Sequence, residues 1–564
     1  MAKDNAYQQT RHHFQQWQDQ LKSSLLAKNS SLMHTFNHYF AGQPEFVQSL
    51  ADFASEVSIH LEPVVMDNNL DVNLPHVEHY NAIGERNDRV IHHPSYIKAG
   101  DIIYGCNLMH FLRTPGQMLK TLSLFLLSSH AGEAGHNCPI ACSAGIIRLL
   151  NKYPDIKHKE KYLDKLTTPS FKDNFTGAQF ITEIQGGSDV GANITQAYQD
   201  ENQQWRIKGE KWFCSNANAE LVLLTARFDE NISGTKGLGL FLVPDQLDNG
   251  QSNHYRIRRL KQKIGTRSMA TGEIDFEDAK AYLIGEPKDG IHLVMENVLH
   301  VSRIFNAFSV LGMARRAYQT AYYYALNRQA FQHPIIEYPL VKERLAHIKA
   351  ENTAMLASVF HMAHCQDKLD QQNHPEASEK LLLRILANLN KYFTAMRSVE
   401  NIHHCLDVLA GNGTIETFSS LPRLLRDCIV CENWEGTHFV LWMQIVKDIN
   451  KFQVDEIFLH HIDELLSQIL DKDEQHYFYK NKQQLEKEFN TFKSLNLQEQ
   501  SLKIQFIVKK MITLLSAITL ILELQHGEHP VSKKASLILF IRKYLNPEYH
   551  AEENYPGLLE KVLG

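Results

Sequence analysis

This sequence lacks a long apolar run, an excess of basic residues and a dense cysteine framework. The longest uncharged apolar stretch late in the chain, Met511 to Leu522, is shorter than the ~20 helical residues that cross a bilayer. The first ten residues also lack the apolar segment of a secretory signal. The eight cysteines are scattered along 564 residues, which favours reduced thiols over disulfides and predicts a cytoplasmic protein.

Charge and motif content exclude further classes of protein. The sequence has 58 Lys and Arg against 64 Asp and Glu, a formal net charge of −6, which argues against a globally basic nucleic-acid binder. It contains no Walker loop, and no Gly-x-Gly-x-x-Gly segment opens a helix after a strand, so neither a P-loop nor a Rossmann nucleotide site is supported. Hydrophobic residues make up 43% and charged residues 22% of the chain, which is typical of a folded globular protein.

Two cysteine-bearing clusters could suggest a metal site. They are Cys428-x-x-Cys431 and the segment from His136 through Cys138 to Cys142. Zinc sites usually combine two such clusters at a defined spacing, and neither cluster has a suitable second one. We therefore expect no metal, and we expect these cysteines to be buried thiols that pack as small apolar groups.

The periodicity of the apolar residues divides the chain into five parts. The chain is longer than the ~250–300 residues that one core supports, so several domains are expected. Helical periods alternate with one stretch of period 2, which predicts a mainly α, α+β fold. Residues 62–100, with three prolines, are expected to form a long irregular connection. The parts are a helical N-terminal extension (1–60), an N-terminal helical domain (61–175), a central β-barrel (176–290), a C-terminal helical bundle (291–450) and an additional helical domain (451–564).

Four polar segments could carry chemistry, and each has a plain structural alternative. The segment 182–190 contains two adjacent glycines that allow close backbone approach, but it also fits any polar turn. The strand 209–216 places aromatics where they could flank a planar ring or simply pack in a core. Arg328 could bind a pyrophosphate or cap a helix. Glu435, beside Gly436, could be a general base if its pocket is dry.

In this order, the segments resemble the motifs of the acyl-CoA dehydrogenase flavoprotein family. The family pattern T-E-x-x-x-G-S-D-V matches Thr182–Val190, and G-x-K followed by (T/S)-N matches Gly209–Asn216. The later segments match the family patterns R-x-x-F, G-G-x-G and (Y/W)-E-G-(T/S) in turn. The last of these patterns matches Trp434–Thr437. Four positions depart from the pattern. Gln332 and Ala410 stand where the family has glycine, Asp407 stands where many members have a glutamine, and His438 stands where a small residue is usual.

The resemblance is closest to the AidB-type branch of that family. The segment from Asn73 to Pro94, the His136-x-Cys138-Pro139 motif and the Trp-Glu-Gly core resemble that branch. The resemblance covers most of residues 73–450 and does not specifically include the first 60. It implies an N-terminal helical domain, a central β-barrel and a helical bundle, with FAD between barrel and bundle.

The resemblance also implies a reaction and its residues. It implies an FAD-dependent oxidoreductase that dehydrogenates an acyl-CoA thioester between its α and β carbons. Glu435 would be the base that removes the α-proton while the β-hydride leaves for flavin N5. The cofactor-binding residues would be Gln179, Ile181, Thr182, Ser188, Phe213, Cys214, Ser215, Arg328, Phe331, Gly411 and Thr437.

Partners follow from the same resemblance. It implies a role in fatty acid metabolism, an acyl-CoA substrate, an electron-transfer flavoprotein as acceptor and a homotetramer. The alternative is an AidB-like flavoprotein with weak dehydrogenase activity and a binding or stress-protection role toward DNA or lipid. Residues 451–564 carry 14 Lys and Arg against 16 Asp and Glu, a balance of −2 that does not favour DNA, because phosphate binding needs clustered basic residues.

Overall fold

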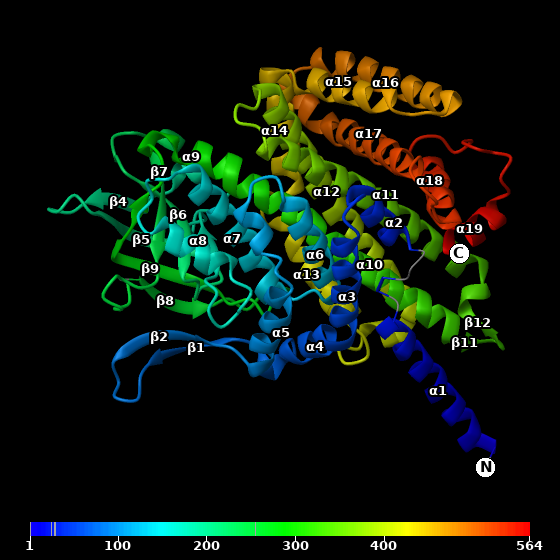
Figure 1. The fold of residues 1–564 in the computed structure, drawn as a ribbon, viewed down its shortest axis with the longest axis horizontal. Coiled ribbons are helices and arrows are strands. Elements are labelled where there is room, and N and C mark those ends of the chain that lie inside the picture. Colours follow the sequence, from blue (N-terminus) through cyan, green and yellow to red (C-terminus); the bar gives the residue numbers. More distant parts are fainter. Residues whose placement is uncertain (1, 24, 27–29, 254) are drawn as a thin grey trace. The chain divides into compact units, whose positions relative to one another are not determined.

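The computed structural model describes residues 2–23, 25–26, 30–253 and 255–564. The chain forms two compact units. Unit 1 comprises Met1–Ile59, Leu126–Ala131 and Asn306–Gly564, and unit 2 comprises His60–Phe125 and Gly132–Phe305. The fold is mainly helical with one central sheet (Figure 1), which confirms the predicted fold class. Among the described residues, no helix is long and apolar enough to cross a membrane.

Residues 62–100 are more regular than the sequence suggested. They contain two helices and a β-hairpin, so the expected long irregular connection is wrong. Pro63 and Pro94 each lie in the first turn of a helix, where the missing N–H removes no helical hydrogen bond. The hairpin turns at Gly84, whose φ is +81° and whose amide donates to the Asn81 carbonyl at 3.0 Å. The elements are α4 (Glu62–Asn68), β1 (His76–Tyr80), β2 (Arg86–Ile91) and α5 (Pro94–Gly105).

Further helices of the N-terminal half follow this hairpin. Helix α6 ends at Gly132, whose left-handed backbone favours glycine. The Glu133 carboxylate then accepts the Gly135 amide at 2.9 Å at the start of the next helix, a capping interaction that satisfies a helical N–H. The helices are α6 (Met118–Ala131), α7 (Ala134–Lys152), α8 (Lys159–Thr167) and, after the sheet, α9 (Gly290–Leu293).

The period-2 stretch forms strands, as predicted, and they join in a single eight-stranded sheet. Its order is β10-β7-β6-β4-β5-β9-β8, and β3 pairs in parallel with β6. Alternate side chains of strands β3 to β9 converge on one apolar core, which includes Phe180, Phe241 and Ile274. The strands are β3 (Gly177–Phe180), β4 (Gln196–Gln199), β5 (Trp205–Ser215), β6 (Leu221–Arg227), β7 (Leu238–Pro244), β8 (Tyr255–Leu260), β9 (Thr271–Lys280) and β10 (Tyr282–Leu283).

The helices of unit 1 come from both ends of the chain. Trp17 of the first helix is buried and donates its indole N–H to the Thr320 carbonyl at 3.0 Å, which fixes that helix on the C-terminal bundle. The helices are α1 (Ala2–Ser23), α2 (Ser31–Tyr39), α3 (Pro44–Glu56), α10 (His300–Asn327), α11 (Pro339–Asp370), α12 (Ala377–Leu409), α13 (Leu421–Asn433) and α14 (His438–Phe452), with the short strands β11 (Gln329–Ala330) and β12 (His333–Pro334) between α10 and α11.

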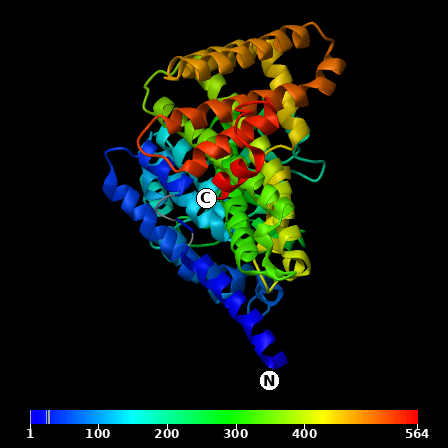
Figure 2. The ribbon, with the colours of Figure 1, turned by 90° about the vertical axis from the view of Figure 1, so that its right-hand side faces the viewer.

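The last 110 or so residues are helical, as their periodicity indicated. Helix α11 packs against α17, α18 and α19, and α15 and α16 lie side by side (Figure 2). The buried Glu351 of α11 accepts hydrogen bonds from Arg397 of α12 at 2.8 Å and from Tyr544 of α18 at 2.8 Å. A buried carboxylate of this kind is stable because several donors compensate it. The helices are α15 (Val454–Ser467), α16 (Lys472–Lys493), α17 (Leu497–Leu524), α18 (Val531–Tyr544) and α19 (Tyr555–Leu563).

Candidate functional site

Seven of the predicted site residues lie on the central sheet of unit 2 or in the turn that follows its strand β3. Gln179 stands on β3, where its side-chain amide donates to Ser302 Oγ at 2.9 Å. Its Oε1 is buried and has no hydrogen-bond partner among the described residues. A buried amide oxygen without a partner costs free energy, so this atom is suited to accept a hydrogen bond from a bound group.

The turn after β3 is compact around Thr182. The Thr182 carbonyl accepts the Trp212 amide at 2.9 Å, which joins the turn to β5. A Cβ on Gly187 would lie 2.5 Å from Thr182 Oγ1, so only glycine fits at that position. Ser188 follows with an exposed side chain. The Ile181 carbonyl accepts the Asn193 side-chain amide at 2.7 Å, and the turn is therefore held at both of its ends.

Two charged residues of the matched motifs form an ion pair beneath this turn. Lys211 Nζ lies 2.7 Å from Glu183 Oε1, and both side chains are almost completely buried. Glu183 also accepts the Ile194 amide at 2.7 Å. Burial acts to raise the pKa of Glu183, but the charge of Lys211 together with the hydrogen bonds from Lys211, Ile194 and Thr195 lowers it. The motifs predicted no role for Glu183 and Lys211, although both residues stand at matched motif positions.

Alternation along β5 separates three of the predicted residues. Phe213 is 51% exposed, and the half-buried Ser215 has its Oγ 3.3 Å from Thr271 Oγ1. Cys214 between them points the other way, into the apolar core of the sheet, where burial raises the pKa of its thiol. The Cys214 side chain therefore faces away from those of Phe213 and Ser215, because successive strand residues face opposite sides, and its assignment to the cofactor stays a prediction.

The other five predicted residues lie in unit 1, where Glu435 occupies the turn from α13 to α14. Glu435 has φ +58° and Gly436 has φ +102°. A left-handed backbone is uncommon for a residue other than glycine, and such conformations concentrate at functional sites. Thr437 then caps α14, since its Oγ1 accepts the Val440 amide at 3.4 Å.

Two residues that sequence reasoning missed hold this turn in place. The buried Lys391 of α12 donates to the Glu432 carbonyl at 2.9 Å and to the Gly436 carbonyl at 2.7 Å. Asn306 of α10 accepts the Trp434 indole N–H at 3.1 Å and donates to the Cys431 carbonyl at 3.0 Å. These contacts fix the backbone on both sides of Glu435. No local sequence signal marks either residue, because both sit inside long helices.

The remaining predicted residues lie on two exposed segments. Phe331 is 90% exposed, has φ +52° and lies in the β11–β12 hairpin. Arg328 precedes the hairpin, and its guanidinium donates to the Gln329 carbonyl at 2.9 Å. Gly411 lies in a 3₁₀ turn after α12, and a Cβ there would meet open space. An aromatic ring exposed this fully gains little from its own fold, so Phe331 is available to contact a partner group.

Ala410 is strained at a position where the matched motif has glycine. Its φ of 50° and ψ of −135° suit glycine rather than a residue with a Cβ. We expect Ala410→Gly to raise the free energy of unfolding by about 1 kcal/mol, measured from the denaturant midpoint. Gly411→Ala, next in the chain, is the control and should change it by less than about 0.5 kcal/mol. A destabilised Ala410→Gly variant would contradict the assignment of strain.

Family models match nearly the whole chain up to α14. The AidB N-terminal domain of the adaptive response protein matches residues 16–173, and the middle and C-terminal domains of acyl-CoA dehydrogenase match 178–279 and 288–449. The putative acyl-CoA dehydrogenase AidB of Escherichia coli strain K12 is 30% identical over 71% of this chain and 74% of its own length. The chain belongs to the acyl-CoA dehydrogenase family. Within this family it falls in the AidB-type branch.

Membership of this family confirms the resemblance that the motifs predicted. It confirms as well the prediction of an FAD-dependent enzyme of the acyl-CoA dehydrogenase class. It also corrects one expectation. The match to the AidB N-terminal domain begins at residue 16, so the family likeness does extend into the first 60 residues. Those residues contain no polar motif like those between Thr182 and Thr437 that carry the family resemblance.

Solved structures of the family share the fold. The structure of Caenorhabditis elegans ACDH-11 in complex with C11-CoA has a TM-score of 0.76 at 23% identity, and the match covers 94% of this chain and 89% of that one. An acyl-CoA dehydrogenase of Bacillus anthracis complexed with FAD has a TM-score of 0.70 at 18% identity, and the match covers 92% and 90% of the two chains. With such coverage the likeness includes helices beyond α14.

Proposed function

We propose that the protein oxidises an acyl-CoA thioester to the 2,3-unsaturated thioester, with Glu435 as the base and FAD as the cofactor. Membership of the acyl-CoA dehydrogenase family supports the reaction class. ACDH-11 of Caenorhabditis elegans was solved with C11-CoA, which supports an acyl-CoA as substrate. The observation that carries the proposal is the turn at Glu435, where a non-glycine residue is held left-handed by contacts on both sides.

The chemistry requires a carboxylate fixed at one place. An α-proton of a thioester is a weak acid, so proton removal depends on a base that is positioned and shielded from water. Lys391 and Asn306 hold the backbone around Glu435. Thr437, the residue after Gly436, is the N-cap of α14. A carboxylate on such a turn needs little reorganisation when the substrate arrives. Glu435 takes the α-proton, and a hydrogen leaves the β carbon, so the thioester loses two hydrogens.

The residues on the sheet fit a flavin. Gln179 offers a buried oxygen without a partner in the described chain, and Gly187 allows a group to approach the backbone beside Thr182. Phe213 presents an exposed ring at the end of β5, which suits stacking on a planar aromatic system. When bound, FAD supplies the acceptor for the electrons and the β-hydrogen. We assign Gln179, Ile181, Thr182, Ser188, Phe213 and Ser215 to it, together with Arg328, Phe331, Gly411 and Thr437.

The flavin of such an enzyme must be reoxidised after each turnover. An electron-transfer flavoprotein would reoxidise the flavin, and the protein would act in fatty acid metabolism as a homotetramer. All eight cysteines are free thiols, in keeping with the reducing conditions of a cytoplasm.

The DNA-binding alternative finds no support in the basic residues of the last segment. Three adjacent basic pairs stand there, Lys509 with Lys510, Lys533 with Lys534 and Arg542 with Lys543, and Lys543 pairs with Glu351. Lys533 is completely buried and pairs with Glu523, and Lys510 pairs with Glu488. Lysines that already neutralise carboxylates are poorly available to phosphates.

The proposal is tested by the flavin itself. The purified protein is expected to be yellow, with the absorption spectrum of FAD. Under anaerobic conditions a matching acyl-CoA from a panel of straight and branched chains should bleach that spectrum. A protein that is colourless and cannot be reconstituted with FAD would overturn the cofactor assignment. A yellow protein that no acyl-CoA bleaches would overturn the substrate assignment.

A further inference from the structure

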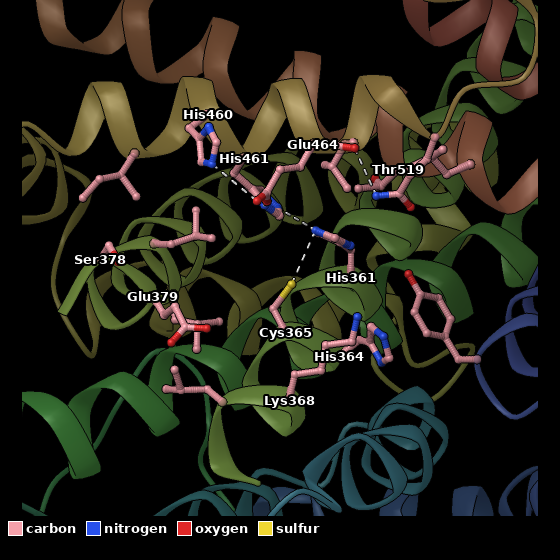
Figure 3. A pocket seen from close by; sticks show the side chains of 18 of the residues that line it. His361, His364, Cys365, Lys368, Ser378, Glu379, His460, His461, Glu464 and Thr519 are labelled. Atoms are coloured by element: carbon pink, nitrogen blue, oxygen red, sulfur yellow. Dashed lines mark hydrogen bonds and ion pairs between the residues drawn. The ribbon is translucent and has the colours of Figure 1, made fainter. Parts of the chain in front are cut away.

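Three metal-ligating side chains converge away from every residue assigned above. His361 and Cys365 lie four residues apart on α11, so they share one face of that helix. His461 comes from α15. His361 Nε2 lies 2.9 Å from His461 Nε2, and Cys365 Sγ lies 3.5 Å from His361 Nε2. All three ligand atoms are within 4.8 Å of one another. Figure 3 shows the three side chains pointing toward one another.

The hydrogen bonding of His461 orients it as a ligand. Its Nδ1 lies 3.3 Å from Glu464 Oε2, and a carboxylate accepts a hydrogen bond, so Nδ1 is the nitrogen that bears hydrogen. In the neutral ring this leaves the lone pair on Nε2, which faces His361 and Cys365. A histidine that donates one ring N–H to a carboxylate while its other nitrogen faces the ion is the usual arrangement around a bound metal.

The spacing of the three atoms suits a small tetrahedral ion. Zinc–nitrogen and zinc–sulfur bonds of about 2.05 and about 2.3 Å at tetrahedral angles place N and S about 3.5 Å apart and two N atoms about 3.3 Å apart. The observed N–S separation of 3.5 Å agrees with this. The N–N separation of 2.9 Å requires the two rings to part by a few tenths of an ångström, roughly one small side-chain rotation.

The surroundings leave the fourth coordination position open. The cluster lines a pocket of about 1140 Å³ that is also lined by His364, Lys368 and His460. Three protein ligands with an open fourth position are typical of zinc sites that bind water or another exchangeable ligand. Two imidazoles and a thiolate select a borderline ion such as Zn²⁺ over Mg²⁺ or Ca²⁺, which prefer oxygen.

We propose that His361, Cys365 and His461 bind one divalent ion of the Zn²⁺ class. The ion would join α11, which lies within the segment matched by the acyl-CoA dehydrogenase C-terminal domain, to α15, which lies beyond it. Neither the dehydrogenase reaction nor the flavin needs this site. It also reverses the expectation of no metal, which considered only the clusters around Cys138 and Cys428.

A second His-rich group provides the contrast. His403, His404 and Asp407 also lie within 4.8 Å of one another, but all three belong to α12. His404 Nε2 lies 3.1 Å from the guanidinium of Arg344, whose charge opposes a cation. His403 and Asp407 are exposed. This group serves as the internal control for metal binding.

The test uses the full-length FAD-loaded protein, stripped of metal with a chelator and titrated with Co²⁺, then with Zn²⁺ in competition. We expect one Co²⁺ per chain, a near-ultraviolet thiolate-to-metal charge-transfer band and strong visible bands of four-coordinate cobalt. Cys365→Ser should abolish the charge-transfer band, and His461→Ala should weaken binding at least about 100-fold. FAD content checks that each variant is folded.

Matched controls decide the origin of any signal. Cys405→Ser removes another buried cysteine, and His403→Ala alters the exposed group on α12. Both variants should leave the charge-transfer band and the affinity unchanged. Absence of any thiolate band in the wild type, or a band that persists in Cys365→Ser, would overturn the proposal.

Discussion

Glu435→Gln is expected to slow anaerobic flavin bleaching by an acyl-CoA about 10²- to 10⁴-fold, the usual contribution of a general base. The amide is nearly the same size as the carboxylate but does not accept the α-proton. The turn should survive, because Lys391, Asn306 and Thr437 hold its backbone. FAD content should therefore equal that of the wild type, and stopped-flow absorbance gives the rate.

Glu432→Gln is the matched control for this experiment. Glu432 stands three residues earlier, and its carboxylate lies 3.0 Å from His438 Nε2. This change removes one negative charge beside the same turn, and Lys391 still binds the Glu432 carbonyl. Bleaching by Glu432→Gln should remain within a few-fold of the wild-type rate. Equal losses in the two variants would show that Glu435 acts through local charge and not as the base.

Lys211→Met is expected to destabilise the sheet of unit 2 by about 3–5 kcal/mol, the cost of breaking a buried ion pair from one side. The change leaves the Glu183 carboxylate buried without its cation. That carboxylate also holds the Ile194 and Thr195 amides at 2.7 and 3.2 Å, so the turn that contains Thr182 and Ser188 should loosen as well. The prediction is a lower unfolding midpoint together with weaker FAD binding.

Two further variants separate the effect of breaking the ion pair from the effect of removing any lysine side chain from the strand. Lys208→Met changes an exposed residue of the same strand and should shift the midpoint very little. Glu183→Gln combined with Lys211→Met removes both charges and should recover part of the loss, because no unpaired buried charge remains. A Lys211→Met protein as stable as the Lys208→Met protein would contradict the importance of this ion pair.

The sequence predicted what periodicity and motif order can encode. The period-2 residues of 205–280 became β5 to β9, and the motif order identified a family that the comparisons confirm. Prolines misled the prediction at 62–100, since Pro63 and Pro94 begin helices instead of breaking structure. Cys214 was included with its neighbours, although the alternation of a strand directs it into the core.

Other parts of the site are formed by contacts between residues that are distant in the sequence. Lys391 and Asn306 lie in long helices, and nothing in their local sequence shows that they reach the turn at Glu435. The pairing of Glu183 with Lys211 needs two strands in register. His361 and Cys365 form a visible helical pair, but His461 reaches them only because α15 folds back onto α11. Single-sequence patterns report local structure and therefore could not reveal these contacts.

We propose that this protein removes hydrogen from the α and β carbons of an acyl-CoA. A single anaerobic turnover of the FAD-loaded protein with a thioester deuterated at both α positions tests this reaction. The C11 thioester, found with ACDH-11 of Caenorhabditis elegans, is a suitable first substrate. Mass spectrometry should find one 2,3-unsaturated product per reduced flavin, lacking one α-deuterium and one β-hydrogen. A thioester recovered with both deuterium atoms and no double bond, for every chain length tried, would contradict the claim.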